Sequence, residues 1–157
     1  MAVRFVPFTE VDFHAWLVQA IPAFALSNVQ DGHWSLAESI GKSQEAHAAL
    51  LPQGLATPGQ FFMHLHDDGG ERVGSLWWAE SDKGGQREAY VYNIEIAEVA
   101  RRRGFARAAF AELERLARGH GVQQIGLHVF GHNAGARRLY DELGFEPTSI
   151  TLRKVLR

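Results

Sequence analysis

A run of three arginines is the first group of residues that could bind a charged ligand. Arg101, Arg102 and Arg103 precede Gly104, and a regular apolar pattern begins directly after this glycine. Backbone N–H groups at a helix N-terminus attract anions, glycine lets the main chain approach closely, and arginine adds charge-assisted donors. This arrangement suits a pyrophosphate. Alternatively, the arginines form a solvated basic turn without a ligand.

A second polar group lies further along the chain. Asn133 is a suitable helix N-cap, and positions 133, 136, 137 and 140 share one face of the helix that would follow. The phenol of Tyr140 on that face stays protonated at neutral pH, so it can donate a proton to a leaving group. Alternatively, Tyr140 packs in the core with its hydroxyl satisfied.

The elements that would position these groups follow from hydrophobic periodicity and from turn residues. The predicted strands are Val3–Phe8, Gln60–His66, Arg72–Ala79, Glu88–Ile96, Gln123–Phe130 and a last one within Gly144–Val155. The predicted helices are Glu10–Leu26 with a kink or break at Pro22, Trp34–Leu51 with a cap at Ser35, a helix from Gly104 to Gly119, and Asn133 to Leu143. The polar stretch Ser81–Gln86 is expected to be a mobile loop.

Length and composition predict one domain over residues 1–157 and exclude several classes of protein. The chain has 157 residues, 46% of them hydrophobic, and a formal net charge of -2, so we expect neither nucleic-acid nor membrane binding over its surface. No apolar run is long enough for a membrane helix, and the N-terminus lacks a signal-peptide layout, so a cytoplasmic location is expected. The chain has no cysteine, which excludes disulfides and an acyl-cysteine intermediate.

Metal and nucleotide chemistry find little support in the sequence. The eight histidines form no His-Glu-x-x-His array, and a strand ending in a solvated turn explains His64, His66 and Asp67 more simply than a chelate does. Gly41-Lys42-Ser43 lacks the upstream glycine of a P-loop. We therefore expect no metal.

Together, the two polar segments resemble the GNAT superfamily of N-acetyltransferases. Arg101, Gly104 and Ala106 match its phosphate-binding signature. The later signature of the family is matched by Asn133, Ala136, Leu139-Tyr140 and Gly144-Phe145. Both signatures occur in the family's order, and the match covers residues 90–145.

The resemblance implies an α/β (α+β) fold. Its mixed, mostly antiparallel central sheet would have about six to seven strands flanked by helices. The sheet would splay between the strand ending near Ile96 and the strand ending near Phe130, and acetyl-CoA would lie in that gap. The implied cofactor-binding residues are Ile94, Glu95, Ile96, Arg101, Arg102, Arg103, Gly104, Phe105, Ala106, Arg107, Asn133, Ala136, Arg137 and Tyr140.

The implied chemistry needs a base and an acid. An alkyl amine with a pKa of about 10.4 is mostly protonated at pH 7, so a group must accept its proton. Glu95 is the first candidate for that base and His128 the second. Alternation along the strand could instead turn Glu95 away from the cleft, as a surface carboxylate. Tyr140 is the candidate acid, and the backbone N–H of Ile96 is the candidate donor to the thioester oxygen.

The resemblance thus implies an acetyl-CoA-dependent N-acetyltransferase that uses direct attack in a ternary complex and no metal. Its acceptor would be an amine on a small molecule, a peptide or a protein, and a homodimer is left open. The main alternative is a non-catalytic acyl-CoA-binding or regulatory module of the same fold. A partner-binding role of Trp77 and Trp78 is a third reading, although one of two adjacent strand tryptophans usually faces the core.

Overall fold

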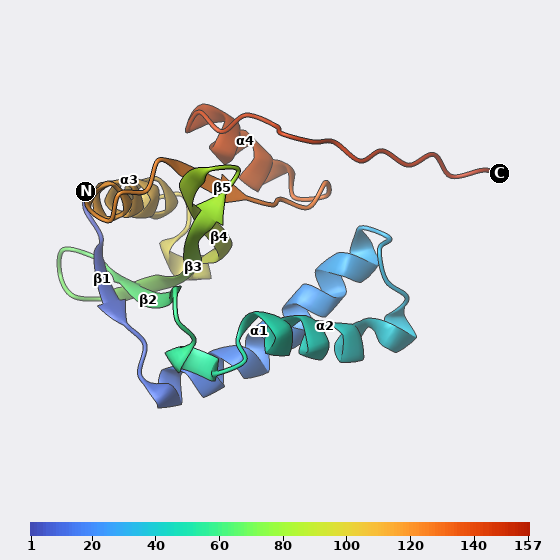
Figure 1. Cartoon of the computed structure of the whole chain (residues 1–157), viewed down its shortest axis with the longest axis horizontal. Helices are drawn as coiled ribbons and strands as arrows, with labels where there is room; N and C mark the ends of the chain where they lie inside the picture. The colour runs from blue at the N-terminus through green and yellow to red at the C-terminus, as the bar shows by residue number, and fades with distance from the viewer.

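The computed structural model describes all 157 residues, which form one mixed sheet with helices on both faces (Figure 1). The strands are β1 (Arg4–Pro7), β2 (Gln60–His66), β3 (Arg72–Lys83), β4 (Gln86–Ile96) and β5 (Gln124–Leu127). The helices are α1 (Glu10–Gln30), α2 (Leu36–Leu50), α3 (Phe105–Gly119) and α4 (Ala134–Glu142), and short 3₁₀ turns span Gly54–Ala56 and Glu98–Ala100. This is the expected mixed α/β fold, with five strands instead of six or seven.

The five strands lie in chain order across the sheet, from β1 at one edge to β5 at the other. β1 to β4 pair antiparallel, and β5 alone runs parallel to its neighbour β4. A parallel neighbour requires a crossover connection, and α3 provides it. The expected sheet, mixed and mostly antiparallel, is therefore confirmed.

Alternating side chains of the strands build two hydrophobic cores, one on each face of the sheet. On one face, Leu76 and Trp78 pack with α3 residues such as Phe110 in the larger core. On the other face, Trp77 packs with Phe13 of α1 in a smaller aromatic core. The opposite directions of neighbouring side chains in β3 follow from the two-residue repeat of a strand.

Local capping signals set the helix boundaries as predicted. Glu38 accepts a hydrogen bond from the backbone N–H of Ser35 at 3.1 Å, the reciprocal bond of a capping box at the start of α2. Helix α1, however, continues past Pro22 to Gln30, so the predicted break is absent. Ser43 of α2 donates its hydroxyl to the carbonyl oxygen of Ile21 at 2.7 Å, which holds the two helices together beside the proline.

Two expectations about the strands were wrong. The stretch predicted as a mobile loop extends β3 and β4 into a tight hairpin, in which Lys83 pairs with Gln86 around Gly84 and Gly85. Both glycines have positive φ, +59° and +82°, which a two-residue hairpin turn favours. At the C-terminus, no strand forms after Gly144, and residues 146–157 are exposed and extended (Figure 1).

Candidate functional site

The sheet splays between β4 and β5. The parallel pairing of the two strands ends at Val91 and Leu127, whereas β4 continues from Tyr92 to Ile96. β4 ends at the predicted residue, but β5 ends at Leu127 and not near Phe130. The backbone groups on this edge of β4 are therefore left without a strand partner, and an extended ligand could bond to them.

A β-bulge marks the point where the opening begins. Trp77 pairs with Asn93 and Trp78 pairs with Val91, so Tyr92 is the extra residue of β4. A bulge bends its strand and increases its local twist, which turns the end of β4 away from β5. The opening is thus a property of the backbone register.

The N-terminus of α3 follows the wide end of this opening. Gly104 is its N-cap with φ of 88°, a left-handed conformation that glycine adopts at little cost. The first backbone bond of the helix runs from Ala108 N–H to the Gly104 carbonyl oxygen at 3.0 Å. The N–H groups of Phe105, Ala106 and Arg107 precede that bond and have no helical acceptor, so they can bind an anion.

The arginines around this terminus are exposed, and three of them have defined contacts. Arg101 donates through Nε to the carbonyl oxygen of Ile96 at 3.0 Å, which joins the loop to the end of β4. The guanidinium of Arg103 lies over the ring of Phe105. Arg107 forms an ion pair with Glu142 of α4, so its side chain links two helices.

Helix α4 starts as the sequence predicts. The side chain of Asn133 accepts a hydrogen bond from the backbone N–H of Ala136 at 3.2 Å, which is an N-cap. The backbone N–H of Arg137 donates to the carbonyl oxygen of Asn133. Asn133 and Arg137 are exposed and Ala136 is partly exposed.

Tyr140 has features of both a proton donor and a core residue, the two roles predicted for it. Its half-buried ring packs against Phe110 and Phe145, each at a centroid distance of 5.7 Å. Burial raises the pKa of the phenol above its usual value of 10, with no hydrogen bond contributing to the shift. The ring therefore packs on the core while the hydroxyl stays protonated and free of a partner in the chain.

On the α1 side of the sheet, the end of β4 borders a cleft of about 330 Å³. The exposed side chain of Glu95 lines this cleft together with Asp12, Trp16 and His64. Asp12 lies 3.1 Å from His64, and its pKa is lowered to about 2, first by the backbone N–H of Thr9 and then by His64. Glu95 thus reaches a cleft that already holds the carboxylate of Asp12 beside the ring of His64.

His128 occupies a different place from the one expected. It follows the end of β5 and is exposed, with its ring edge-on to Phe130 at 5.0 Å. The prediction that it lies on the strand facing Glu95 was wrong, because β5 is only four residues long.

Sequence reasoning missed a buried carboxylate and two tyrosines at the narrow end of the opening, on the face of the sheet that α1 and α2 cover. Glu88 is 7% exposed and accepts a hydrogen bond from Gln124 Nε2 at 2.8 Å, and no cation pairs with it. A Cβ at Gly126 would lie 2.8 Å from this carboxylate, so the glycine makes room for it. Tyr90 and Tyr92 stand edge to face at 4.8 Å, and burial, with a smaller effect of the Glu88 charge, raises the pKa of both. The two-residue spacing of Glu88 and Tyr90 could have indicated this group, since alternate residues of a strand lie on the same face.

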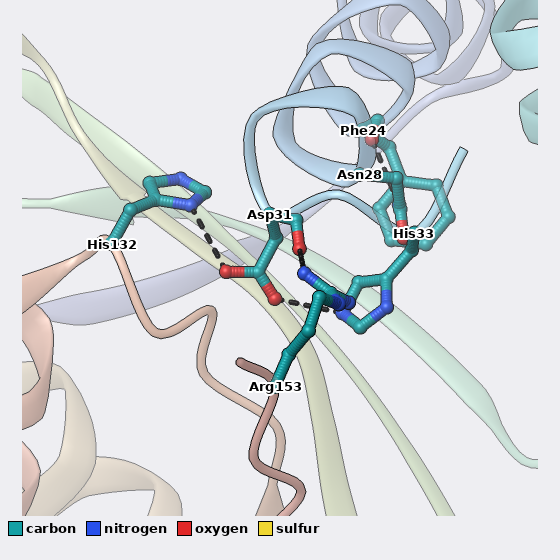
Figure 2. A network of polar contacts seen from close by, with 6 residues as sticks. All are labelled: Phe24, Asn28, Asp31, His33, His132 and Arg153. Atoms are coloured by element: carbon teal, nitrogen blue, oxygen red, sulfur yellow. Dashed lines mark hydrogen bonds and ion pairs between the residues drawn. The ribbon is translucent and has the colours of Figure 1, made fainter. Parts of the chain in front are cut away.

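A polar network joins the turn between α1 and α2 to the loop before α4 (Figure 2). The Asp31 carboxylate lies 2.7 Å from His33 Nε2 and 3.5 Å from His132 Nδ1. His132 directly precedes Asn133, so the network connects the start of α4 to the helices on the cleft side.

The structure holds neither a metal cluster nor a membrane-spanning helix. No group of three or more histidine, aspartate or glutamate side chains is placed to share a metal ion. None of the helices has the length and apolar character needed to cross a membrane.

Known proteins are similar to the chain in both sequence and architecture. Residues 27–145 match the model of the acetyltransferase (GNAT) family. The chain is 34% identical over 156 residues to YdgE of Bacillus subtilis strain 168, an uncharacterized N-acetyltransferase, with 99% of each protein covered. It is 32% identical over 156 residues to YycN of the same strain, also an uncharacterized N-acetyltransferase, with 99% of this chain and 100% of YycN covered. The crystal structure of YycN superposes with a TM-score of 0.94 over 99% of each chain, at 31% identity.

Proposed function

The chain belongs to the acetyltransferase (GNAT) family, and from that premise we propose that it transfers an acetyl group from acetyl-CoA to a primary amine. The observation that carries the proposal is the opening between β4 and β5, which leads to the free N–H groups at the start of α3. An extended arm with a pyrophosphate at one end fits this combination of strand edge and helix terminus. Acetyl-CoA is such a molecule.

We infer a position for each part of the cofactor. The pyrophosphate would accept hydrogen bonds from the backbone N–H groups of residues 105–107 and from the exposed arginines before them. The pantetheine arm would lie along residues 94–96 of β4, with Asn133, Ala136 and Arg137 on its other side. The thioester would then sit near the bulge at Tyr92.

The reaction would be a direct attack within a ternary complex. The amine nitrogen forms a bond to the carbonyl carbon, the carbon–sulfur bond breaks, and the products are an amide and free CoA. The carbonyl oxygen gains negative charge, and an unpaired backbone N–H of β4 beside the bulge would stabilise it. The N–H of Ile96, the first candidate from the sequence, lies at the other end of this edge and is replaced in that role. The attacking nitrogen must also lose its protons, and the departing sulfur needs one.

Glu95 and Tyr140 are the proposed groups for these proton transfers. Glu95 is an exposed carboxylate on the cleft side of β4 and can accept the amine proton directly or through water. Tyr140 has a free hydroxyl, and its raised pKa keeps that hydroxyl protonated at neutral pH, so it can donate a hydrogen bond or a proton to the thiolate. His128 stays the second candidate base, although its exposed position after β5 favours Glu95.

The charges near the opening support an amine as the acceptor. Glu88 is a buried carboxylate without a paired cation, close to the two tyrosine rings at the narrow end. A carboxylate beside aromatic faces attracts an ammonium group electrostatically. We therefore favour an acceptor with a second cationic group, such as a diamine, that Glu88 holds while the neutral amine reacts.

The test is release of free thiol from acetyl-CoA in the presence of a panel of amines. The chain has no cysteine, so a thiol reagent reports only CoA. We expect amine-dependent thiol release with acetylated amine found by mass spectrometry, and faster release with diamines than with matched monoamines. Binding of acetyl-CoA without release for any amine would favour the non-catalytic module, and absence of binding would overturn the proposal as a whole.

A further inference from the structure

The cleft beside Glu95 contains a histidine that the proposed reaction does not use. His64 lies on β2, is 7% exposed and lines this cleft together with Asp12 of α1. Its ring stacks on the ring of Phe8 at a centroid distance of 4.3 Å. The stacking fixes the plane of the imidazole at the edge of the cleft.

The two ring nitrogens of His64 have different surroundings. Nε2 is buried without an aligned hydrogen bond, and Oδ2 of Asp12 lies 3.1 Å away from it. Asp12 is a carboxylate at neutral pH, because the backbone N–H of Thr9 and then His64 lower its pKa to about 2. A carboxylate only accepts hydrogen bonds, so it favours the tautomer with the proton on Nε2. Nδ1 forms no hydrogen bond within the chain and is not buried, so its lone pair is open to the cleft.

The register of the sheet places His64 and Glu95 in one row, with Ser75 between them. His64 of β2 pairs with Ser75 of β3, and Ser75 pairs with Glu95 of β4. Side chains of directly paired residues lie on the same face, with Cβ atoms about 4.5 to 5.5 Å apart. All three residues line the cleft. The hydroxyl of Ser75 both accepts and donates hydrogen bonds, and a water molecule can bridge each remaining gap, so the row connects the two titratable groups.

An imidazole is better suited than a carboxylate to hold a released proton. Carboxylic acids titrate near pH 4 and imidazoles near pH 6.5, so an imidazole retains a proton at neutral pH about a hundredfold better. The groups around His64 act on its charged form in both directions. The carboxylates of Asp12 and Glu95 favour the imidazolium, and the cation of Arg72 in the same cleft opposes it. His66, on the same strand with its ring centroid 6.4 Å away, also opposes it when protonated.

We propose that His64 is the final acceptor of the proton that the amine loses, and that Asp12 is a positioning residue that holds its ring in the required tautomer. The proposal rests on the proposed function, in which Glu95 takes this proton first. The amine proton bonds to the carboxylate of Glu95, and the resulting carboxylic acid passes a proton through Ser75 and water to Nδ1 of His64. Glu95 is then a carboxylate again. The imidazolium, balanced by Asp12, releases its proton to solvent before the next turnover.

The first test measures the tautomer of His64 by ¹⁵N NMR of the full chain, and it needs no substrate. We expect the neutral ring to carry its proton on Nε2. In Asp12→Asn, the proton should distribute over both nitrogens, because an amide donates as well as accepts. The rise of turnover with pH should also move to lower pH in Asp12→Asn, because the imidazolium loses a neighbouring negative charge and gives up its proton more readily.

The second test measures turnover after the ring nitrogens are removed. His64→Phe keeps a ring stacked on Phe8, and we expect kcat to fall by about tenfold, with the KM for the amine and the affinity for acetyl-CoA unchanged. His64→Ala leaves the space of the ring empty, so added imidazole should restore its turnover but not that of His64→Phe. His66→Phe is the matched control on the same strand and should keep the turnover of the wild type.

Failure of this relay is distinguishable from failure of the proposed function. Wild-type turnover in His64→Phe, no rescue of His64→Ala by imidazole, or a neutral ring with its proton on Nδ1 would each overturn the relay and leave the proposed acetyl transfer standing. Absence of thiol release with every amine would overturn the proposed function, and the relay with it. Circular dichroism establishes that each variant is folded, and the tautomer measurement on the wild-type chain depends on no variant.

Discussion

The hydroxyl of Tyr140 can be removed without disturbing the packing of its ring. In Tyr140→Phe, the contacts with Phe110 and Phe145 persist, and no hydrogen bond within the chain is lost. The free energy of unfolding should therefore change by less than about 0.5 kcal/mol. A buried hydroxyl with a partner would instead cost about 1 to 3 kcal/mol on removal.

The effect on turnover should be much larger than the effect on stability. If the phenol protonates the departing thiolate, turnover should fall by roughly 10- to 10³-fold, equivalent to about 1.4 to 4 kcal/mol in the activation barrier. Acetyl-CoA affinity should stay nearly unchanged, because the interaction strengthens only in the transition state. The burial that raises the pKa of Tyr140 also predicts that loss of activity through its ionisation begins above its usual pKa of about 10.

The assay combines thiol release, acetyl-CoA titration calorimetry and urea unfolding on one preparation. Phe145→Leu is the matched control, because it removes a ring contact of Tyr140 and leaves the hydroxyl in place. This variant should lose about 1 kcal/mol of stability and keep its turnover per folded molecule. Unchanged turnover in Tyr140→Phe would refute the acid role, and a loss of stability alone would assign the residue to the core.

Other changes test the anion site, the acceptor site and two titrating groups. Gly104→Val should weaken acetyl-CoA binding, measured by calorimetry, because a branched side chain obstructs the phosphate approach and its φ of 88° adds strain of about 1 to 2 kcal/mol. Glu88→Gln should raise the KM for diamines by about tenfold, measured with the thiol assay, and leave acetyl-CoA affinity unchanged. The pKa of Asp12 is about 2, below its value in the unfolded chain. Its stabilising effect is therefore present above about pH 4 and lost as pH falls toward 2. Asp12→Asn should flatten the pH dependence of the free energy of unfolding, measured in urea, over that range. Burial lowers the pKa of His66, and nearby arginines add to the shift, so stability should fall as pH drops below about 6.5, and His66→Phe should reduce that fall.

Controls and contrary results differ among these four. Asparagine tolerates the left-handed backbone, so Gly104→Asn separates the obstruction of the phosphate from the backbone strain. If Gly104→Val weakens acetyl-CoA binding no more than Glu114→Ala does, the anion-site assignment is wrong. A KM change in Glu88→Gln that is equal for monoamines and diamines would refute the second cationic contact. Parallel pH profiles of wild type and either titration variant would mean that the group does not control stability.

Much of the fold could be predicted from capping and turn residues that are close together in the sequence. The Ser35 and Glu38 pair and the Asn133 cap lie within one helical turn of the helices they start, so the sequence contains both partners of each bond. Gly84-Gly85 was also a local signal, for a two-residue hairpin, but the polar residues around it resembled a loop. Pro22 predicted a break that contacts with α2 override.

Long-range partners could not be predicted in the same way. The ion pair of Arg107 with Glu142 and the place of Glu88 beside Gln124 depend on how α3, β4 and β5 meet. The C-terminal alternation predicted a strand within residues 144–155, and the structure has none there, because whether a segment pairs depends on a distant sheet edge that local residues do not encode.

The central claim is that acetyl-CoA occupies the opening between β4 and β5, with its pyrophosphate at the start of α3. Hydrogen exchange, followed residue by residue with and without saturating acetyl-CoA, tests this most directly. We expect new protection of the backbone N–H groups of residues 92–96 and of residues 105–107, together with a rise in thermal midpoint of about 5 to 10 °C at a hundredfold excess over Kd. Protection that leaves both of these segments unchanged, or no change at millimolar acetyl-CoA, would contradict the claim.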